Sequence, residues 1–460
     1  MSTEKGESER LRVPQPLIKS RIASGRGAME QPNVTGDGDA ALTPVFWLAV
    51  LLTGVITGLI GDGLMGILQI AERVAFHYRG GSFTNAVAAT SDVRRVGMLL
   101  IAGCFGAGAW YLIRRYFGHE HSEIDEAVWN GTGELGIRRS ALTSVVSEIV
   151  IGFGASIGRE AAPKLMGGAA GSVLSQWFRL SAAQRRLLVA CGGGAGLACV
   201  YNVPLGGAIF TAEVLLGSFT IPTVMPALLC SLVATGTAYL SLSASPTYAH
   251  LPTYQSSASL LTWSVVGGVA IGLLSVGYIR LIGWASVLRP KGLHVLWAMP
   301  AAFGVVGVLG IWWPQLFGNG KDMAHDAFFG LGGLGILALL WILKPLVTTL
   351  TLGSGAAGGV FTPFLATGAV FGALAGTAWI HFWPGSPVGA FALIGAAAMI
   401  GAAMQAPLSG LVLVLELTFS GFTLALPMML ATLIATAVSR QVDGYSIYSA
   451  RLPKRREATS

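Results

Sequence analysis

Gly158-Arg-Glu-Ala-Ala-Pro-Lys-Leu-Met-Gly-Gly-Ala169 has a counterpart 200 residues later in the chain, Gly358-Gly-Val-Phe-Thr-Pro-Phe-Leu-Ala-Thr-Gly-Ala369. A second pair follows in the same order, Asn202-Val-Pro-Leu-Gly-Gly207 and Gln405-Ala-Pro-Leu-Ser-Gly410, at an offset of 203 residues. In both members of this second pair, a glutamate stands nine residues after the proline. Internal duplication, often with inverted topology, is a common construction of transporters and places the binding site where the repeats meet. The two pairs therefore predict a chain made of two related halves.

The composition places both halves in a membrane. Hydrophobic residues make up 53% of the 460 residues and charged residues only 11%, whereas soluble domains carry about a quarter charged residues. Several apolar runs approach or exceed the roughly 20 residues that cross a bilayer as a helix. These runs cover residues 42–70, 97–113, 221–242, 260–279, 295–317, 329–343 and 424–438. We therefore predict an all-α polytopic membrane protein with two inverted repeats of membrane helices.

Other apolar stretches are too short to span a bilayer, and glycine, proline or a carboxylate interrupts them. They cover residues 145–157, 187–200, 205–216 and 410–417. Half-length helices are tolerated at membrane depth where they are buried in protein or line a polar cavity. We therefore expect many helices to be tilted or broken, with the binding site among the short ones.

The polar segments divide the chain into five parts. Residues 1–41 are predicted to form a cytoplasmic arm, 42–243 the first membrane repeat, 244–259 a linker, 260–440 the second repeat and 441–460 a tail. Basic residues gather in the arm and the tail (Arg10, Arg12, Lys19, Arg21, Arg26, Arg451, Lys454, Arg455 and Arg456). The positive-inside rule then predicts that both termini are cytoplasmic. The net charge of +7 therefore indicates membrane topology rather than nucleic-acid binding.

The glycine-dense turn from Gly353 to Pro363 runs into an apolar stretch and is a candidate anion site. Unpaired N–H groups at a helix start carry partial positive charge and bind anions without a full cation. Gly158 to Pro163 is the repeat-related helix start, and it contains Glu160. An ionised Glu160 would compete for the anion site and plug the path, and a protonated one could swing away. The alternatives are that these glycines only pack helices and that Glu160 pairs with Arg159.

These motifs resemble those of the ClC family of chloride channels and chloride/proton antiporters, over nearly all of residues 43–450. Gly158-Arg-Glu160 is similar to the family's gating-glutamate motif, and the amides of Val360 and Phe361 match those that face its central anion. Ser446-Ile-Tyr448 is similar to the segment with the pore tyrosine, and Ser122, within His119-Glu-His-Ser-Glu-Ile-Asp-Glu126, stands where the pore serine belongs. The likeness is greatest to the short bacterial ClcB-type branch. The resemblance implies Glu160 as gate and an anion site formed by Ser122, Gly158, Arg159, Val360, Phe361 and Tyr448.

Three departures from the family pattern affect this interpretation. His121, Glu123 and Asp125 replace glycines and a proline of the first signature, and acids near an anion path repel the substrate unless they are protonated, paired or turned away. Alanines 161 and 162 precede Pro163 in the gate motif. The position of the internal proton glutamate of antiporters holds Val214, so Glu213 beside it is the candidate for a proton path.

The resemblance together with Val214 predicts a chloride channel, gated by voltage or pH, in a bacterial inner membrane. It also implies a homodimer with one pore per subunit and a role as an electrical shunt during acid stress. A proton-coupled chloride antiporter is the alternative, followed by a secondary transporter of another anion. Chloride is the expected ligand, without a cofactor.

Enzyme and metal-site interpretations fit the sequence poorly. Gly154-Ala-Ser-Ile-Gly158 matches a nucleophile elbow but lacks the preceding strand and the nearby base. His119 and His121 are two residues apart and so do not share a helical face, because helical neighbours lie three or four apart. The four cysteines lack metal-ligand spacing. We therefore expect neither an enzyme nor a metal centre.

Overall fold

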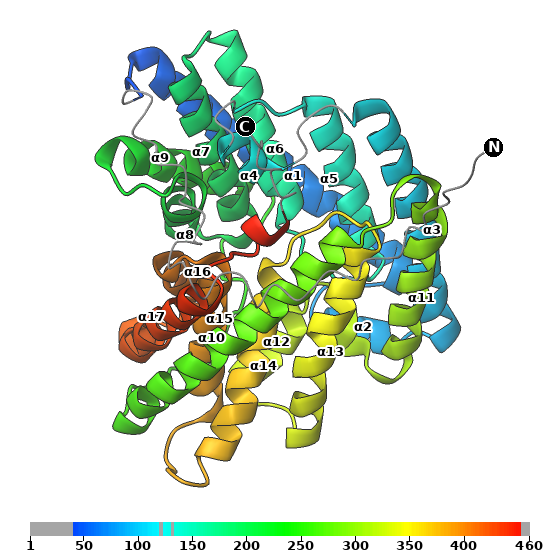
Figure 1. Cartoon of the computed structure of the whole chain (residues 1–460), viewed down its shortest axis with the longest axis vertical. Coiled ribbons are helices and arrows are strands. Elements are labelled where there is room, and N and C mark those ends of the chain that lie inside the picture. Colours follow the sequence, from blue (N-terminus) through cyan, green and yellow to red (C-terminus); the bar gives the residue numbers. More distant parts are fainter. Residues whose placement is uncertain (1–39, 119–122, 130–132, 452–460) are drawn as a thin grey trace, which may run out of the picture.

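The computed structural model describes residues 40–118, 123–129 and 133–451, and in these ranges the chain is helical. The helices of the first half are α1 (Pro44–Phe76), α2 (Phe83–Ala88), α3 (Asp92–Phe117), α4 (Ile124–Trp129), α5 (Ile137–Gly152), α6 (Ala161–Trp177), α7 (Ala182–Tyr201), α8 (Pro204–Phe210), the π-helix η1 (Thr211–Leu216) and α9 (Ile221–Ala238). Those of the second half are α10 (Ala258–Val287), α11 (Val295–Trp312), α12 (Lys321–Phe328), α13 (Leu334–Gly353), α14 (Phe361–Trp379), α15 (Val388–Met404), α16 (Pro407–Thr418) and α17 (Ala425–Val442). Figure 1 shows the early helices mostly above the later ones, with α8 and α16 between them.

Eight helices of the described ranges are long and apolar enough to cross a membrane, which confirms the polytopic prediction. Seven of them extend or overlap the seven predicted runs. The eighth, α14, was not predicted as a span because glycine and threonine interrupt its apolar residues. In its most apolar window 72% of the residues are buried, against 39–50% for the others. Hence α14 lies inside the protein.

The short helices form the centre of the molecule. Helices α7 and α15 are buried along almost their entire length, and each packs closely on the helix before it. A Cβ on Gly192 of α7 would overlap the carbonyl of Gly167 in α6, and one on Gly395 of α15 would overlap that of Gly368 in α14. Small residues at these crossings let the backbones touch, as is usual for membrane helices.

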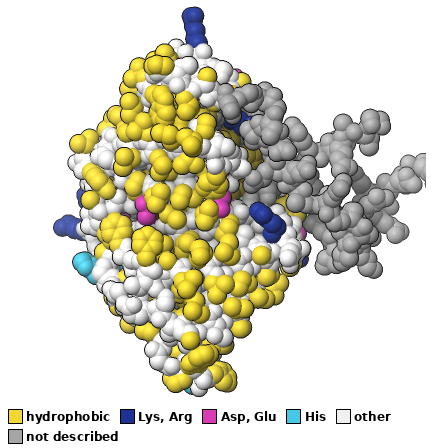
Figure 2. Space-filling model, turned by 90° about the vertical axis from the view of Figure 1, so that its left-hand side faces the viewer, with side chains coloured by type: hydrophobic (Ala, Val, Ile, Leu, Met, Phe, Trp, Pro, Cys, Tyr) yellow, Lys and Arg dark blue, Asp and Glu magenta, His cyan; other side chains and the backbone are white. Residues whose placement is uncertain are grey.

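The outer helices expose apolar side chains, as a lipid-facing surface requires. Figure 2 shows a face on which hydrophobic side chains extend from top to bottom and charged groups are few. Residues 244–257 of the predicted linker lie between α9 and α10, and its last two residues, Ala258 and Ser259, begin α10. The predicted N-terminal arm lies outside the described residues except for Ala40 and Ala41, and the tail is described as far as Arg451.

Candidate functional site

The two repeat-related helix starts meet at the centre of the molecule. Glu160 is the residue before α6 and Val360 the residue before α14. Just upstream, Gly158 and Gly359 form an antiparallel bridge, in which the Gly158 amide donates to the Gly359 carbonyl at 2.7 Å and the Gly359 amide returns the bond at 2.8 Å. This bridge ties the two starts together, so that the side chain of one can reach the backbone of the other.

The carboxylate of Glu160 occupies the N-terminus of α14. Its Oε1 accepts a hydrogen bond of 2.7 Å from the Phe361 amide, and its Oε2 accepts one of 3.1 Å from the Tyr201 hydroxyl. The Thr362 hydroxyl lies 3.5 Å from Oε2, and only 5% of the residue is exposed. A helix start is an anion site, and the carboxylate therefore stands where a free anion would bind.

Glycines on both sides make room for this carboxylate. A Cβ on Gly158 or on Gly359 would overlap the carboxyl atoms of Glu160. Neither glycine has a positive φ, so the need for glycine here is the close approach itself rather than an unusual backbone conformation. The same close approach explains why glycine stands at position 158 and at position 359.

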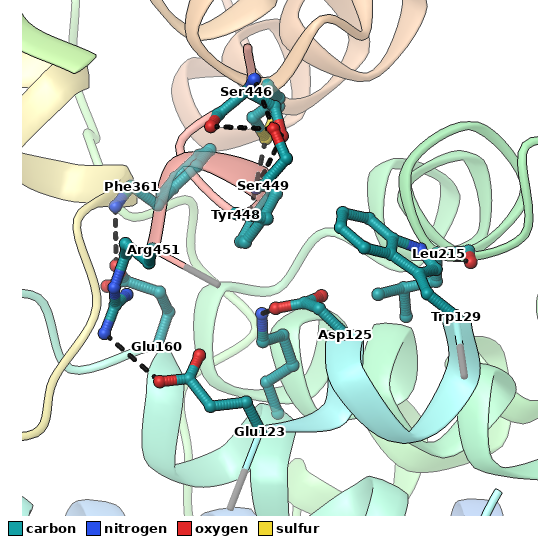
Figure 3. A network of polar contacts seen from close by, with 12 residues as sticks. Glu123, Asp125, Trp129, Glu160, Leu215, Phe361, Ser446, Tyr448, Ser449 and Arg451 are labelled. Carbon is teal, nitrogen blue, oxygen red and sulfur yellow. Dashed lines mark hydrogen bonds and ion pairs between the residues drawn. The ribbon is translucent and has the colours of Figure 1, made fainter. Parts of the chain in front are cut away.

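On one side of Glu160 lies a narrow cavity of about 80 Å³, called here the Tyr448 pocket. Its lining includes Glu160, Val360, Phe361 and Tyr448. The structure thus gathers four predicted site residues around one cavity, and Figure 3 shows Tyr448 and Glu160 facing it together with Glu123 and Asp125. The Tyr448 ring packs edge-on against Phe210, with ring centroids 6.0 Å apart.

The acids of the altered first signature are paired with cations in the same pocket. Asp125 Oδ2 lies 3.3 Å from the Lys164 ammonium, which also lies 4.4 Å from the centroid of the Tyr448 ring. Glu123 Oε1 lies 3.5 Å from the Arg451 guanidinium. Burial alone would raise the pKa of Glu123, but Arg451 and other nearby cations outweigh it and hold that pKa below its usual range. Pairing therefore limits the repulsion that these acids would exert on an anion.

On the other side of Glu160 lies a larger cavity of about 330 Å³, called here the Arg159 pocket. Its lining includes Glu72, Tyr78, Arg159, Lys321 and Asp322. The Arg159 guanidinium lies 5.1 Å from the centroid of the Tyr201 ring.

For two predicted anion-site residues, Gly158 and Arg159, the structure directs the polar group away from the amides of Val360 and Phe361. Arg159 faces the other pocket, and the Gly158 amide is used in the bridge to Gly359. Ser122 and the histidines of the first signature lie outside the described residues.

Glu213 caps a helix of the opposite repeat. Its carboxylate accepts from the backbone amides of Leu408 and Ser409 at the start of α16, at 3.2 and 2.6 Å. Glu416 makes the equivalent contact in the other direction: its carboxylate accepts from the backbone amides of Leu205 and Gly206 at the start of α8. The second repeated motif therefore forms a reciprocal pair of caps. Val214 beside Glu213 is buried.

The serine of the elbow-like motif is bound to a cation rather than to a base. Ser156 Oγ accepts a 2.9 Å hydrogen bond from the fully buried Lys344 ammonium, which also donates to the carbonyls of Leu316 and Gly318. Lys344 Nζ is thus engaged as the donor to three oxygen acceptors. No group of three metal-ligating side chains occurs among the residues that the structure describes.

Sequence reasoning missed several residues of the site. Tyr201 and Thr362 hold the Glu160 carboxylate, and Lys164 supplies the cation beside Tyr448. Glu148 is a further carboxyl group, fully buried in α5. Lys164 and Glu148 carried a readable signal, because a charged residue in an apolar membrane segment is a functional candidate by default.

The chain matches the family model described as "Voltage gated chloride channel" over residues 96–440. A ClcB-like protein of Ralstonia nicotianae is 31% identical over 73% of this chain and 79% of its own length. The "Voltage-gated ClC-type chloride channel ClcB" of Citrobacter koseri is 28% identical over 87% of this chain and 97% of its own. The "H(+)/Cl(-) exchange transporter ClcA" of Vibrio campbellii is 27% identical over 94% of both chains.

Two solved structures have the same fold. A slow cyanobacterial Cl⁻/H⁺ antiporter matches with a TM-score of 0.78 and 23% identity, over 89% of this chain and 97% of that one. A CLC-type fluoride/proton antiporter matches with a TM-score of 0.71 and 20% identity, over 88% of this chain and 97% of its own. The likeness thus extends across nearly the whole of these proteins.

Proposed function

This chain belongs to the voltage-gated chloride channel family, ClC, and we propose that it is a chloride channel whose gate is the side chain of Glu160. The proposal rests on one observation above all: the Glu160 carboxylate accepts from the Phe361 amide at the start of α14. A carboxylate held at a helix N-terminus and a chloride ion compete for the same partial positive charge. In this state the path is closed, and chloride passes when the carboxylate leaves.

Protonation of Glu160 is the proposed opening step. The neutral acid loses about half of the strength of its hydrogen bonds to the helix start, because hydrogen bonds to an ionised group are about twice as strong as those between neutral groups. The proposed path then runs through the Tyr448 pocket, past Phe361 and Val360. Lys164 keeps a positive charge beside the anion and balances Asp125.

The channel is preferred to the antiporter because Val214 cannot carry a proton. Glu213, the other candidate for a proton path, has both carboxylate oxygens engaged with backbone amides of α16. A proton on Glu213 would weaken both of these hydrogen bonds. The relatives include chloride channels and proton exchangers alike, so the two activities have to be separated by experiment.

The test is chloride efflux from liposomes that contain the purified protein, with the external pH recorded at the same time. A channel releases chloride without proton movement. Proton uptake in a fixed ratio to chloride release would make the protein an exchanger, and the absence of chloride flux would contradict both. Tyr448→Ala and Ser122→Ala should weaken chloride binding, measured by calorimetry, if those residues line the path.

The cellular role proposed is a chloride shunt in the inner membrane of a bacterium, which balances charge moved by other systems during acid stress. Both termini are proposed to be cytoplasmic, in line with the basic residues near them. A homodimer with one pore in each subunit is proposed from the family. Cross-linking in native membranes would test the dimer.

A further inference from the structure

Glu148 is a buried carboxyl group that the proposed gating does not use. It lies in α5, is 0% exposed, and neither of its oxygens has a hydrogen-bond partner among the residues that the structure describes. An ionised carboxylate in such a place is very costly, so the group is expected to hold a proton. A buried carboxylic acid whose O–H has no acceptor is unusual, and its presence at position 148 requires an explanation.

The helix that carries Glu148 contributes residues to both pockets. Ser147, its neighbour in α5, lines the Tyr448 pocket and donates to the Ala357 carbonyl at 2.9 Å. Ile151, almost one turn further, lines the Arg159 pocket. Glu148 therefore lies on the helix that separates one side of the gate from the other.

The titratable and charged groups that face Glu148 are Glu72 from α1, and Arg159 and Glu160 from the approach to α6. Arg159 in turn is in electrostatic contact with both Glu72 and Glu148. The α1 and α5 backbones meet closely here, because a Cβ on Gly152 would lie 3.2 Å from the Glu72 amide nitrogen. Two carboxyl groups, Glu72 and Glu148, thus act on one guanidinium, and Glu72 also lines the Arg159 pocket.

From this arrangement we propose that Glu148 is a proton relay, which passes protons between Glu72 at the Arg159 pocket and the gate carboxylate of Glu160. The inference rests on the proposed gating function and deepens it. Because neither Glu148 oxygen has a partner in hydrogen-bond reach among the described residues, each transfer in the proposed relay passes through a water molecule that enters between the side chains. By this route the Glu148 acid gives its proton to the Glu160 carboxylate and becomes the carboxylate, and Glu72 then gives a proton to Glu148 and takes one from water in the Arg159 pocket. The net change is one proton moved from that water to Glu160.

Arg159 explains why the relay can be ionised for a short time. Its positive charge acts on Glu72 and Glu148 and stabilises whichever of the two carries the negative charge. A purely structural Glu148 would gain nothing from its acid, since a buried polar group without partners costs free energy relative to an apolar residue of similar size. The relay also makes gating sensitive to the pH on the side of the Arg159 pocket, without a proton path through the protein.

The main experiment is an acid step applied to liposomes that contain Glu148→Gln, with chloride efflux followed by stopped flow. The variant should reach the same final flux at acidic pH but activate more slowly than the wild type, by about tenfold or more for the loss of a positioned proton donor. Glu148→Asp, which keeps the acid, should recover part of the rate. Glu134→Gln is the matched control, because Glu134 is an exposed glutamate paired with Arg185. An unchanged activation rate in Glu148→Gln would overturn the relay.

Two further measurements separate the relay from the gate. In a Glu160→Gln background, Glu148→Gln should have no additional effect on pH dependence, because the relay acts only through Glu160. An additional effect would contradict the proposal. Infrared spectra at neutral pH should contain the C=O band of an unbonded carboxylic acid in the wild type, and that band should be absent in Glu148→Gln. This band does not depend on chloride flux, so a protein without flux would refute the proposed function alone, whereas a missing band would refute the relay alone.

Discussion

Two pairs of repeat-related helix starts meet, α8 with α16 and α6 with α14, and only the first pair has symmetric carboxylate contacts. At α8 and α16, Glu416 accepts from the amides of Leu205 and Gly206 at 3.1 and 2.6 Å, and Glu213 accepts from the matching amides of α16 at 3.2 and 2.6 Å. At α6 and α14, Glu160 accepts from the Phe361 amide. Val360, which stands at the position of Glu160 in the second repeat, has no acceptor on its side chain.

We propose that this difference separates structural carboxylates from the gate carboxylate. Each symmetric carboxylate caps a helix start that no anion needs to reach, and both can stay in place while the protein works. In the proposed gating, the asymmetric contact allows the Glu160 carboxylate to leave the start of α14. A side chain that must leave its site cannot also be required to hold the two halves together, and the glycine bridge performs that task instead.

The largest effect is expected from Glu160→Gln, which removes the charge from the asymmetric contact. A hydrogen bond to a charged group contributes about 1.5–3 kcal/mol, which corresponds to a roughly 10- to 100-fold change in the population of the closed state. Chloride efflux at neutral pH should rise accordingly and lose its dependence on pH. Loss of all flux in a variant that elutes as a folded protein in size-exclusion chromatography would count against the gate.

A smaller effect on chloride flux is expected from Gly359→Ala. This substitution keeps the charge of Glu160 but fills the space that its carboxylate occupies. The new Cβ would overlap the Glu160 carboxylate, whose flexible end moves away more easily than backbone does. Flux at neutral pH should rise on the order of several-fold, because overpacking costs about 1–3 kcal/mol and is relieved here by displacing the gate. Gly236→Ala in α9 is the control, since its Cβ would meet nothing within 4 Å. Equal chloride flux in Gly359→Ala and Gly236→Ala would mean that the overlap of the new Cβ with Glu160 does not displace the gate.

The sequence predicted the contacts between the repeated motifs better than it predicted the surroundings of individual charges. The offsets of 200 and 203 residues anticipated both inter-repeat contacts, because inverted repeats bring matching motifs together. The pairing of Asp125 with Lys164 was not predictable, since the two residues are 39 positions apart and on different helices. The buried helix α14 was missed as a span because a helix surrounded by protein does not need a continuous apolar surface. The position of Arg159 in a separate pocket depends on the turn before α6, which no pattern encodes.

The symmetric contact should respond in stability rather than in gating. Glu213→Gln and Glu416→Gln each remove the charge from a pair of caps, and each should lower the free energy of unfolding by about 1.5–3 kcal/mol. The two losses should be similar, and the pH dependence of chloride flux should not change. Unfolding in detergent measures the first effect and liposome efflux the second. If Glu213→Gln changed the pH dependence of chloride flux and Glu416→Gln did not, Glu213 would be a candidate proton carrier. The two carboxylates would then not have the same structural role.

The smallest effect is expected from Glu123→Gln, at the mouth of the Tyr448 pocket. The pKa of Glu123 is held below its usual range by Arg451 and its neighbouring cations, so the charged form stabilises the folded state above the pKa of the unfolded chain and this stabilisation is lost as the pH falls through the folded pKa. More than a third of the side chain is exposed, and solvent screening limits the contribution to a few tenths of a kcal/mol, or about 1 kcal/mol at most. The variant should therefore unfold at a slightly lower temperature than the wild type at pH 7, and the two should converge in acid. A difference as large as that of the cap variants would contradict the small contribution expected for this partly exposed ion pair.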